Sequence, residues 1–231
     1  MYSGTVRRPS LVFFTLLAVS LARAQEAVPP PQPPQEDINR RVFGLLSNHR
    51  TADGSAPYQP ITIRRKFYIG AMDSVDYPAY ALPIFIAGVY QLADRNPSFG
   101  QGMEGYGKRY AGAFADQALG NMMTASVFPS LLRQDPRYFR MGKGTNWART
   151  RYALTRVFQA RNNEGQWGFN YSEWLGSTSA VGISNLYYPS DTSNAVSNSR
   201  KLVMKVGTHA LSHVLREFWP DWQRKFFRGK P

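Results

Sequence analysis

The stretch GYGKRYAGAFADQALGN, residues 105–121, has the spacing of a helix, yet eight of its seventeen residues are glycine or alanine. A glycine inside a helix costs about 1 kcal/mol relative to alanine. Small residues also let a neighbouring helix approach closely, and that contact offsets the cost. The stretch therefore predicts the Gly/Ala-rich central helix of a bundle, extending to residue 125.

Two ridges of this helix define its expected packing. Gly107, Ala111 and Ala115 lie four residues apart, and we expect the backbone of another helix to pack against them. The neighbouring ridge is aromatic and is expected to fill the grooves beside the small one. Its members are Tyr106, Tyr110 and Phe114.

A third stripe carries charge at Arg109 and Asp116, with Gly112 and Gly120 on the same side. The two charges lie roughly 10 Å apart along the axis, too far to pair. Each therefore needs a partner on another helix or contact with water. Asp116 among small residues is a candidate catalytic acid with a raised pKa. The alternative, which we favour, is a structural acid satisfied by an arginine or a backbone amide.

Helical spacing also covers most of the remaining chain, and few segments alternate with period two. Helices are expected over 62–72, 77–93, 100–132, 147–161, 171–188 and 194–218. The fold class is therefore all-α. We predict a compact multi-helix bundle that forms one domain over residues 37–231.

The N-terminus has the features of a secretory signal peptide over residues 1–24. Two arginines precede an apolar run, and the ARA motif at 22–24 is a small-x-small cleavage site. An uncleaved anchor is the alternative, but the run is short for a membrane span. Residues 25–36 form a proline-rich linker. We therefore expect an exported protein in the periplasm or at the outer membrane of a bacterial envelope.

The chain has a formal net charge of +13 and no cysteine. Thiol nucleophiles, disulfides and cysteine-based zinc sites are therefore excluded. The positive charge favours an anionic partner such as a membrane surface, lipopolysaccharide or an acidic envelope polymer. The alternative is a solvated surface that only aids solubility. No nucleic acid partner is expected outside the cytoplasm.

The segment YPAYALPIFIAGVYQLA (77–93) contains no charged residue. It is slightly shorter than a typical membrane-spanning helix, and Pro78 and Pro83 interrupt its hydrogen bonding. We therefore predict a buried core helix here, with a membrane span as the alternative.

The segment FWPDWQRKFFRGK (218–230) mixes aromatic and basic residues, a combination that suits a membrane interface with anionic lipids. The alternative is a C-terminal helix that packs its rings on the bundle and leaves its charges in water. The candidate membrane- or anion-binding residues are Trp219, Trp222, Arg224, Lys225, Phe226, Phe227 and Arg228.

Two histidines, His209 and His213, are four residues apart and can reach one divalent ion. Glu217 follows at the same spacing, but three ligands at i, i+4 and i+8 extend over about 12 Å, too long for one ion. We therefore favour the polar face of a packed helix over a metal site. No cofactor is expected.

Three further residues are candidates for binding or catalysis. In QDPRYFR (134–140), Asp135 is expected to cap a short helix, and Arg137 and Arg140 are candidates for binding phosphate. Contact with the bundle's own acids is the role we favour for both arginines. Glu173 follows a helix cap and is the second candidate catalytic acid. The chain has no G-x-S-x-G, phosphate-loop or dinucleotide motif.

Four segments carry a resemblance to known sequences: NPSFGQGMEGYGKRYAGAFADQALGN (96–121), FPSLLRQDPRYFR (128–140), FNYSEWLGSTSAVGISNLYYP (169–189) and EFWPDWQRKF (217–226). Together they resemble a family of uncharacterised exported bacterial proteins, over roughly residues 40–228. The resemblance implies a single compact domain. The family has no established activity, so the resemblance implies no catalytic residues.

The leading hypothesis is a non-enzymatic, exported envelope protein that associates with a membrane surface or an anionic envelope partner. The rival hypothesis is a hydrolase-like enzyme with a polar pocket between helices, built from Asp116, Glu173 or the His209–His213 pair. A third hypothesis is an integral helical membrane protein.

Overall fold

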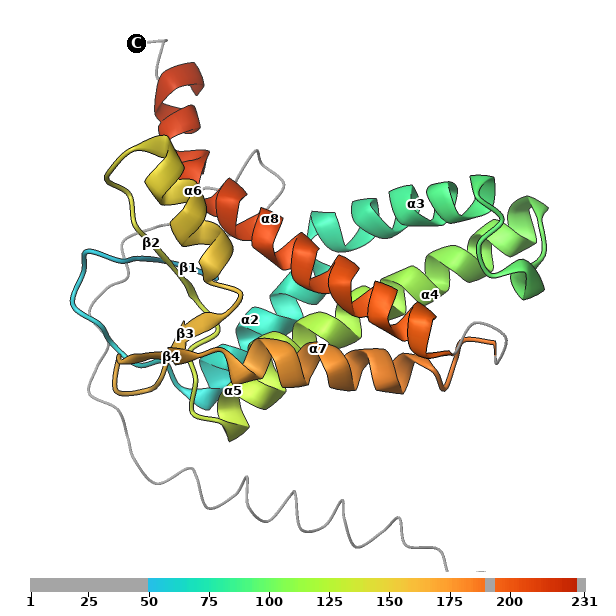
Figure 1. Ribbon diagram of the computed structural model, residues 1–231, viewed down its shortest axis with the longest axis horizontal. Helices are drawn as coiled ribbons and strands as arrows, with labels where there is room; N and C mark the ends of the chain where they lie inside the picture. Colours follow the sequence, from blue (N-terminus) through green and yellow to red (C-terminus); the bar gives the residue numbers. More distant parts are fainter. Residues whose placement is uncertain (1–49, 190–193, 228–231) are drawn as a thin grey trace, which may run out of the picture. The chain divides into compact units, whose positions relative to one another are not determined.

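The computed structural model describes residues 50–189 and 194–227, and helices form most of this part of the chain (Figure 1). The predicted all-α character is confirmed, with only four three-residue strands in addition. The predicted signal peptide and proline-rich linker lie outside the described residues. All described residues belong to one compact unit, Asp37–Pro231.

The helical elements follow the predicted segments closely. They are α2 (Ile63–Val75), α3 (Tyr77–Leu92), the 3-10 helix η1 (Pro97–Phe99), α4 (Gly102–Met122), the π-helical segment η2 (Met123–Val127), α5 (Phe128–Leu131), α6 (Asn146–Thr155), α7 (Tyr171–Ser184) and α8 (Ala195–Phe227). Polar caps begin several of them: the Thr62 and Thr145 hydroxyls accept from backbone amides of α2 and α6.

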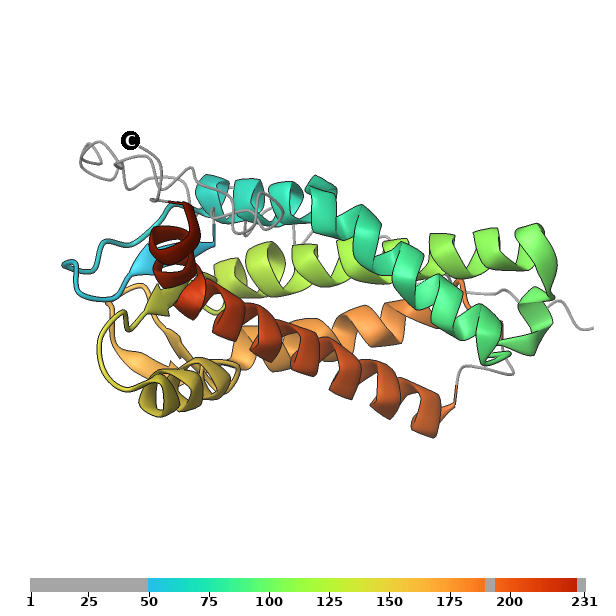
Figure 2. The same ribbon diagram turned by 90° about the horizontal axis from the view of Figure 1, so that it is seen from above.

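Helix α4, built from the glycine-rich stretch, lies among three other helices. It packs against α2, α3 and α7, and α3 runs beside it to η1 in both views (Figures 1 and 2). Helix α8 packs on α6 and α7 and contacts strand β2 (Tyr138–Arg140). The glycine-rich stretch is therefore central, as the sequence predicts.

The buried side of α4 is not the predicted ridge, because Gly107 and Ala111 are exposed. The charged stripe faces inward instead: Arg109, Gly112 and Gly120 are buried. Arg109 donates hydrogen bonds to the backbone oxygens of Arg95, Asn96 and Gly100 and to the Gln91 side chain. The end of α3 and the connection to α4 thus supply four acceptors, and the nearest carboxylate, Asp94 at 3.8 Å, is exposed.

The glycines of this stripe make room for polar side chains rather than for another backbone. A methyl group on Gly112 would lie 2.9 Å from the Tyr188 hydroxyl, and one on Gly120 would overlap the ammonium group of Lys205. Both side chains reach across the stripe to Asp116. The predicted contact of main chain with main chain is therefore wrong for these glycines.

Close approach to the backbone occurs one turn further on, at η2. Gly176 of α7 lies against the Met123 backbone, where an added methyl group would come within 3.1 Å of the carbonyl carbon and oxygen. On the other side, a methyl group on Gly70 of α2 would overlap the Ser126 hydroxyl. The glycines that allow close packing here belong to the neighbouring helices, and η2 itself is buried at Thr124, Ala125 and Ser126.

The strands form two small sheets that the sequence did not predict. Strand β1 (Thr51–Asp53) pairs in parallel with β2, and β3 (Gln159–Arg161) pairs antiparallel with β4 (Trp167–Phe169). The expected helix over 147–161 therefore ends at Thr155. The helix expected after Asp135 is also absent, because that carboxylate binds the backbone amide and guanidinium of Arg137 in a turn.

The prediction of a buried core helix over 77–93 is wrong. Helix α3 packs mainly on α4, with a smaller contact to α2, and among its residues of described burial only the narrow stripe Ala79, Pro83 and Ala87 is fully buried. Six large side chains of the helix are exposed, although one of them, Tyr80, stacks on Phe114 of α4, and Leu82, Ile86 and Tyr90 are half-buried. Across the described residues, every helix is too short or too polar to cross a membrane.

Candidate functional site

Glu173 and His209 meet in the interior between α7 and α8. The Asn170 side chain caps α7 by accepting from the Glu173 amide, which fixes the start of the helix. Glu173 is buried, its Oε1 lies 2.6 Å from His209 Nδ1, and Ser177 donates to the same oxygen at 3.1 Å. Burial alone would raise the pKa of Glu173, but the charges of His209 and Arg50 outweigh it and lower the pKa to about 2.

His213 lies one turn after His209 but has a different environment. Its ring stacks on Tyr138 at a centroid distance of 4.9 Å, and its Nδ1 is buried without a hydrogen-bond partner. Burial and the nearby Arg50 charge lower the pKa of His213 to about 3, so the ring is neutral. The part of the chain that the structure describes contains no group of three side chains placed to hold a metal ion.

Glu217 is the centre of a separate buried cluster. Its carboxylate accepts hydrogen bonds from the Tyr138 hydroxyl at 2.7 Å, the Arg149 guanidinium at 2.9 Å, and the backbone amides of Met141 and Gly142. These contacts join α8 to β2 and α6. The sequence indicated Glu217 only as the residue that follows His209 and His213 at the same spacing. Its partner Arg149 lies 68 residues away, so no local pattern connects the two.

Asp116 accepts hydrogen bonds from two adjacent tyrosines rather than from an arginine or a backbone amide. The Tyr187 hydroxyl lies 2.5 Å from one carboxylate oxygen, and the Tyr188 hydroxyl lies 2.9 Å from the other. Lys205 donates to the Asp116 backbone oxygen, and the Lys201 ammonium lies 3.3 Å from the centroid of the Tyr188 ring. The two tyrosines therefore satisfy the Asp116 carboxylate. Glu173, the other candidate catalytic acid, contacts neither tyrosine, so the two acids do not form one site.

The two candidate phosphate-binding arginines both contact acids of the domain. Arg137 binds the Asp135 carboxylate through two nitrogens, the closer at 2.7 Å. Arg140 lies 3.2 Å from Asp221 of α8. The structure thus gives both arginines the partner that the sequence favoured.

The basic-aromatic C-terminal segment is partly inside the domain. Trp219 is only 4 % exposed, so the assignment of this ring to a membrane surface is corrected. The Trp222 ring stacks on Phe218, and Lys225 is exposed. Arg228 lies outside the described residues, and Arg224, Phe226 and Phe227 belong to α8.

Helix α3 exposes six large apolar side chains, a feature that sequence reasoning missed. Leu92 is 91 % exposed and Phe85 is 69 % exposed. The exposed large side chains of this α3 face are Tyr77, Tyr80, Ile84, Phe85, Val89 and Leu92. A surface helix normally turns polar residues to water, whereas α3 has no charge from end to end.

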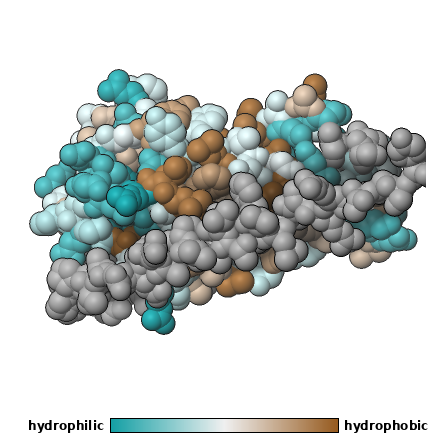
Figure 3. All heavy atoms as spheres, turned by 90° about the horizontal axis from the view of Figure 1, so that it is seen from below, coloured by the Kyte–Doolittle hydropathy of each residue, from teal (hydrophilic) through white to brown (hydrophobic). Residues whose placement is uncertain are grey.

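Exposed apolar residues on other helices differ in their charged surroundings. On α8, Val203, Met204 and Leu211 are exposed, but Lys201 and Lys205 lie on the same helix between or beside them. Helix α7 exposes Tyr171, Leu175 and Ile183, and its one charged residue, Glu173, is buried. Apolar residues also gather on the face in Figure 3. The α3 face therefore differs from α8 in carrying no charge, and from α7 in exposing more large apolar side chains.

No protein-family model, curated protein or solved structure matches this chain. Its function must be inferred from the geometry of its own residues.

Proposed function

We propose that this protein is an exported, non-enzymatic protein of the bacterial envelope that associates peripherally with an anionic membrane surface through the α3 face. One observation carries the proposal: α3 exposes six large apolar side chains and no charge. A contiguous exposed apolar surface of this kind is typical of a membrane or protein interaction site.

Two forces act together in this proposal. Removal of the predicted signal peptide takes three arginines with it and leaves a net charge of (28 − 3) − 15 = +10, which attracts the chain to anionic lipids. These lipids contribute about 1 kcal/mol for each basic residue close to the surface. The α3 face then buries its rings and aliphatic chains in the interface. Leu92 and Met103 lie at the same end of the α3–α4 hairpin, where Gln91 donates to the Gly102 oxygen, and both are almost fully exposed.

Membrane association depends on exposed side chains, so it can be tested without disturbing the fold. Burying an aromatic or aliphatic side chain contributes about 1.5–3 kcal/mol. From their exposed fractions, changing both Phe85 and Leu92 to serine removes about 3 kcal/mol of interfacial binding, which is roughly a 100-fold weaker partition coefficient. The matched control is the double change Val203→Ser and Leu211→Ser on α8, where both residues are also exposed.

The assay is co-sedimentation of the purified protein with phosphatidylcholine vesicles, with and without phosphatidylglycerol. We expect wild type and the α8 control to bind the anionic vesicles, and the Phe85→Ser/Leu92→Ser variant to lose most of its binding. Failure of wild type to bind, or equal binding by the α3 variant, would refute the proposal. Binding to an acidic polysaccharide but not to vesicles would assign the charge to a polymer partner instead.

A hydrolase-like enzyme is the second candidate, because Glu173 and His213 line the same cavity. A hydrolytic site that uses a side-chain nucleophile requires that group within hydrogen-bond reach of a base. His209 Nδ1 is already held by Glu173, and within residues 50–189 and 194–227 His213 Nδ1 contacts no hydroxyl. Asp116 is not among the cavity residues. The geometry therefore favours a non-enzymatic role.

A further inference from the structure

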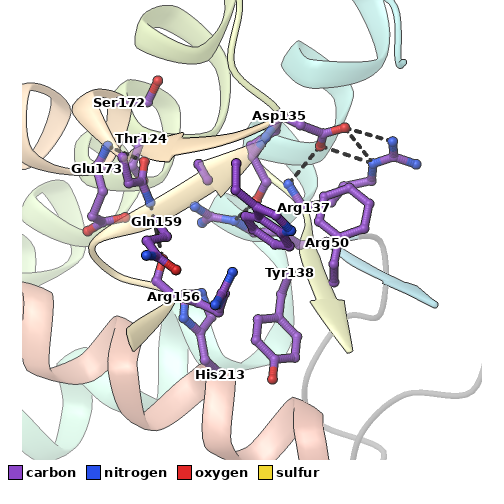
Figure 4. A pocket seen from close by; sticks show the side chains of 15 residues that line it. Arg50, Thr124, Asp135, Arg137, Tyr138, Arg156, Gln159, Ser172, Glu173 and His213 are labelled. Atoms are coloured by element: carbon purple, nitrogen blue, oxygen red, sulfur yellow. Dashed lines mark hydrogen bonds and ion pairs between the residues drawn. The ribbon is translucent and has the colours of Figure 1, made fainter. Parts of the chain in front are cut away.

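A narrow cavity lies where the β2 strand, the β3–β4 hairpin, the start of α7 and the middle of α8 meet (Figure 4). The cavity volume is about 20 Å³. This leaves room for one or two waters, or for one small polar group. Arginines are its most frequent lining residue: Arg50, Arg137 and Arg156.

The charges that line this cavity do not balance. Arg137 is neutralised by Asp135, the pair joined by dashed lines in Figure 4. Glu173 contacts His209 behind the cavity wall, and the charge of Arg50 also acts on the Glu173 carboxylate. The two remaining charges are Arg50, whose nearest carboxylate is Asp73 at 3.8 Å, and Arg156.

Arg156 is held in place but its hydrogen-bonding capacity is not used. Its guanidinium carbon lies 4.1 Å from the ring centroids of both Tyr152 and Trp167. Cation–π contacts of this kind fix the plane of the group and leave its N–H edge free. The Nε is buried without a partner, and within the described chain the guanidinium makes no hydrogen bond or ion pair.

Two other lining groups are able to complete a site. Arg50 donates its Nε to the Pro136 backbone oxygen at 2.8 Å, which orients the guanidinium and leaves its terminal nitrogens available. His213 contributes a buried Nδ1 without a partner. Buried polar groups without partners are rare, and several at one cavity indicate a missing ligand or water.

We propose that this cavity binds a single phosphate group, either free or at the end of a small ligand, through Arg156 and Arg50. One uncompensated and one weakly compensated guanidinium match a doubly charged phosphate better than a carboxylate. Arginine is also the side chain best suited to phosphate recognition. The narrow volume admits the anionic group and leaves the rest of any ligand outside. None of the α3 residues lines this cavity, so the site is independent of the proposed membrane association.

The alternative occupant is water. A water molecule can satisfy the Nε–H of Arg156 but adds no charge, so Arg156 stays uncompensated and Arg50 stays weakly compensated by Asp73. Anion binding and hydration therefore differ in a measurable way. Phosphate should stabilise the folded protein more than chloride at equal ionic strength, because only phosphate bridges the two guanidinium groups.

The test measures the thermal midpoint of the purified protein in millimolar phosphate and in chloride of equal ionic strength. We expect phosphate to raise the midpoint of wild type by several degrees. The increase should disappear in Arg156→Gln and persist in Arg151→Gln, which alters an exposed arginine of α6. Equal midpoints of wild type in the two salts, or an equal increase in Arg156→Gln, would overturn the proposal.

A second measurement does not depend on the folding of a variant. The buried Arg156 Nε–H of the wild-type protein gives an NMR signal that Arg156→Lys assigns by its loss. We expect phosphate, but not acetate, to shift this signal, and an unmoved signal would overturn the proposal. Glycerol phosphate in the same titration separates a phosphate at the end of a ligand from the free ion, because only an open cavity mouth admits the ester.

Discussion

Removing the Glu217 carboxylate should destabilise the domain more than any other single change at an acid. Glu217 is fully buried and accepts four hydrogen bonds, from a tyrosine hydroxyl, an arginine and two backbone amides. Glu217→Ala leaves Arg149 and the Tyr138 hydroxyl buried without this partner. The perturbation therefore removes the carboxylate contacts that join α8 to β2 and α6, while the Glu217 backbone oxygen keeps its hydrogen bonds from Arg140 and Arg149.

The expected loss of unfolding free energy follows from the burial of the Glu217–Arg149 ion pair. Breaking a buried ion pair on one side costs about 3–5 kcal/mol. Arg149 retains Asp221 at 2.5 Å, and Asp221 is partly exposed, so the lower end of that range applies. We expect a loss of about 3 kcal/mol of unfolding free energy, a large part of the roughly 5–15 kcal/mol that stabilises a domain.

The assay is urea unfolding followed by circular dichroism. The midpoint should fall with an unchanged m value, and Glu164→Ala, at an exposed acid of the β3–β4 turn, should leave it unchanged. In a double-mutant cycle, Arg149→Met combined with Glu217→Ala should cost less than the sum of the single changes. A loss below about 1 kcal/mol for Glu217→Ala, or additive losses, would refute the reasoning.

Four further changes test other parts of the structure by the same urea assay. Gly120→Ala should cost about 1–3 kcal/mol because its methyl group displaces Lys205, whereas Gly107→Ala, in open space, should stabilise the helix by up to about 1 kcal/mol. Arg109→Ala should cost at least about 3 kcal/mol, since four acceptors at the end of α3 and in its connection to α4 lose their donor. The pKa of His213 is about 3 in the folded protein against an ordinary 6.5, so between these values only the unfolded chain binds the proton. The unfolding free energy should therefore fall below about pH 6.5, by at most about 1.4 kcal/mol per pH unit, and His213→Gln should remove this fall.

The helices could be predicted from the sequence because their signals are local. The apolar spacing of α8 and the uncharged run of α3 lie within single segments. Helix α3 occurs close to its predicted bounds, and α8 begins as predicted but continues nine residues past its predicted end, to Phe227. The strands could not, because β2 has three residues and pairs with a segment 87 positions earlier in the chain, at Thr51. Three residues cannot display a period of two, so nothing in the sequence distinguished this segment from a capped helix.

The candidate site shows the same division between local and distant information. Glu173 and the His209–His213 pair were recognised as chemically unusual, and two of these three line the cavity. Arg50 and Arg156, which carry its unbalanced charge, were not recognised, because an arginine becomes notable only when its acidic partner is missing. Whether an arginine lacks an acidic partner depends on residues far away in the sequence, so it cannot be predicted from any single segment.

The position of the glycines connects the interior to the surface. Gly112 and Gly120 admit Tyr188 and Lys205 to the middle of the domain, and the buried interior accordingly contains lysine, arginine and glutamate side chains. Phe85 and Leu92 lie outside, on α3, whose fully buried residues among those described are alanine and proline. Removing apolar surface from water is energetically favourable. The fold leaves the uncharged α3 face in water, so a partner that covers this face lowers the free energy. A lipid interface provides that cover and, when it is anionic, also interacts favourably with the net positive charge.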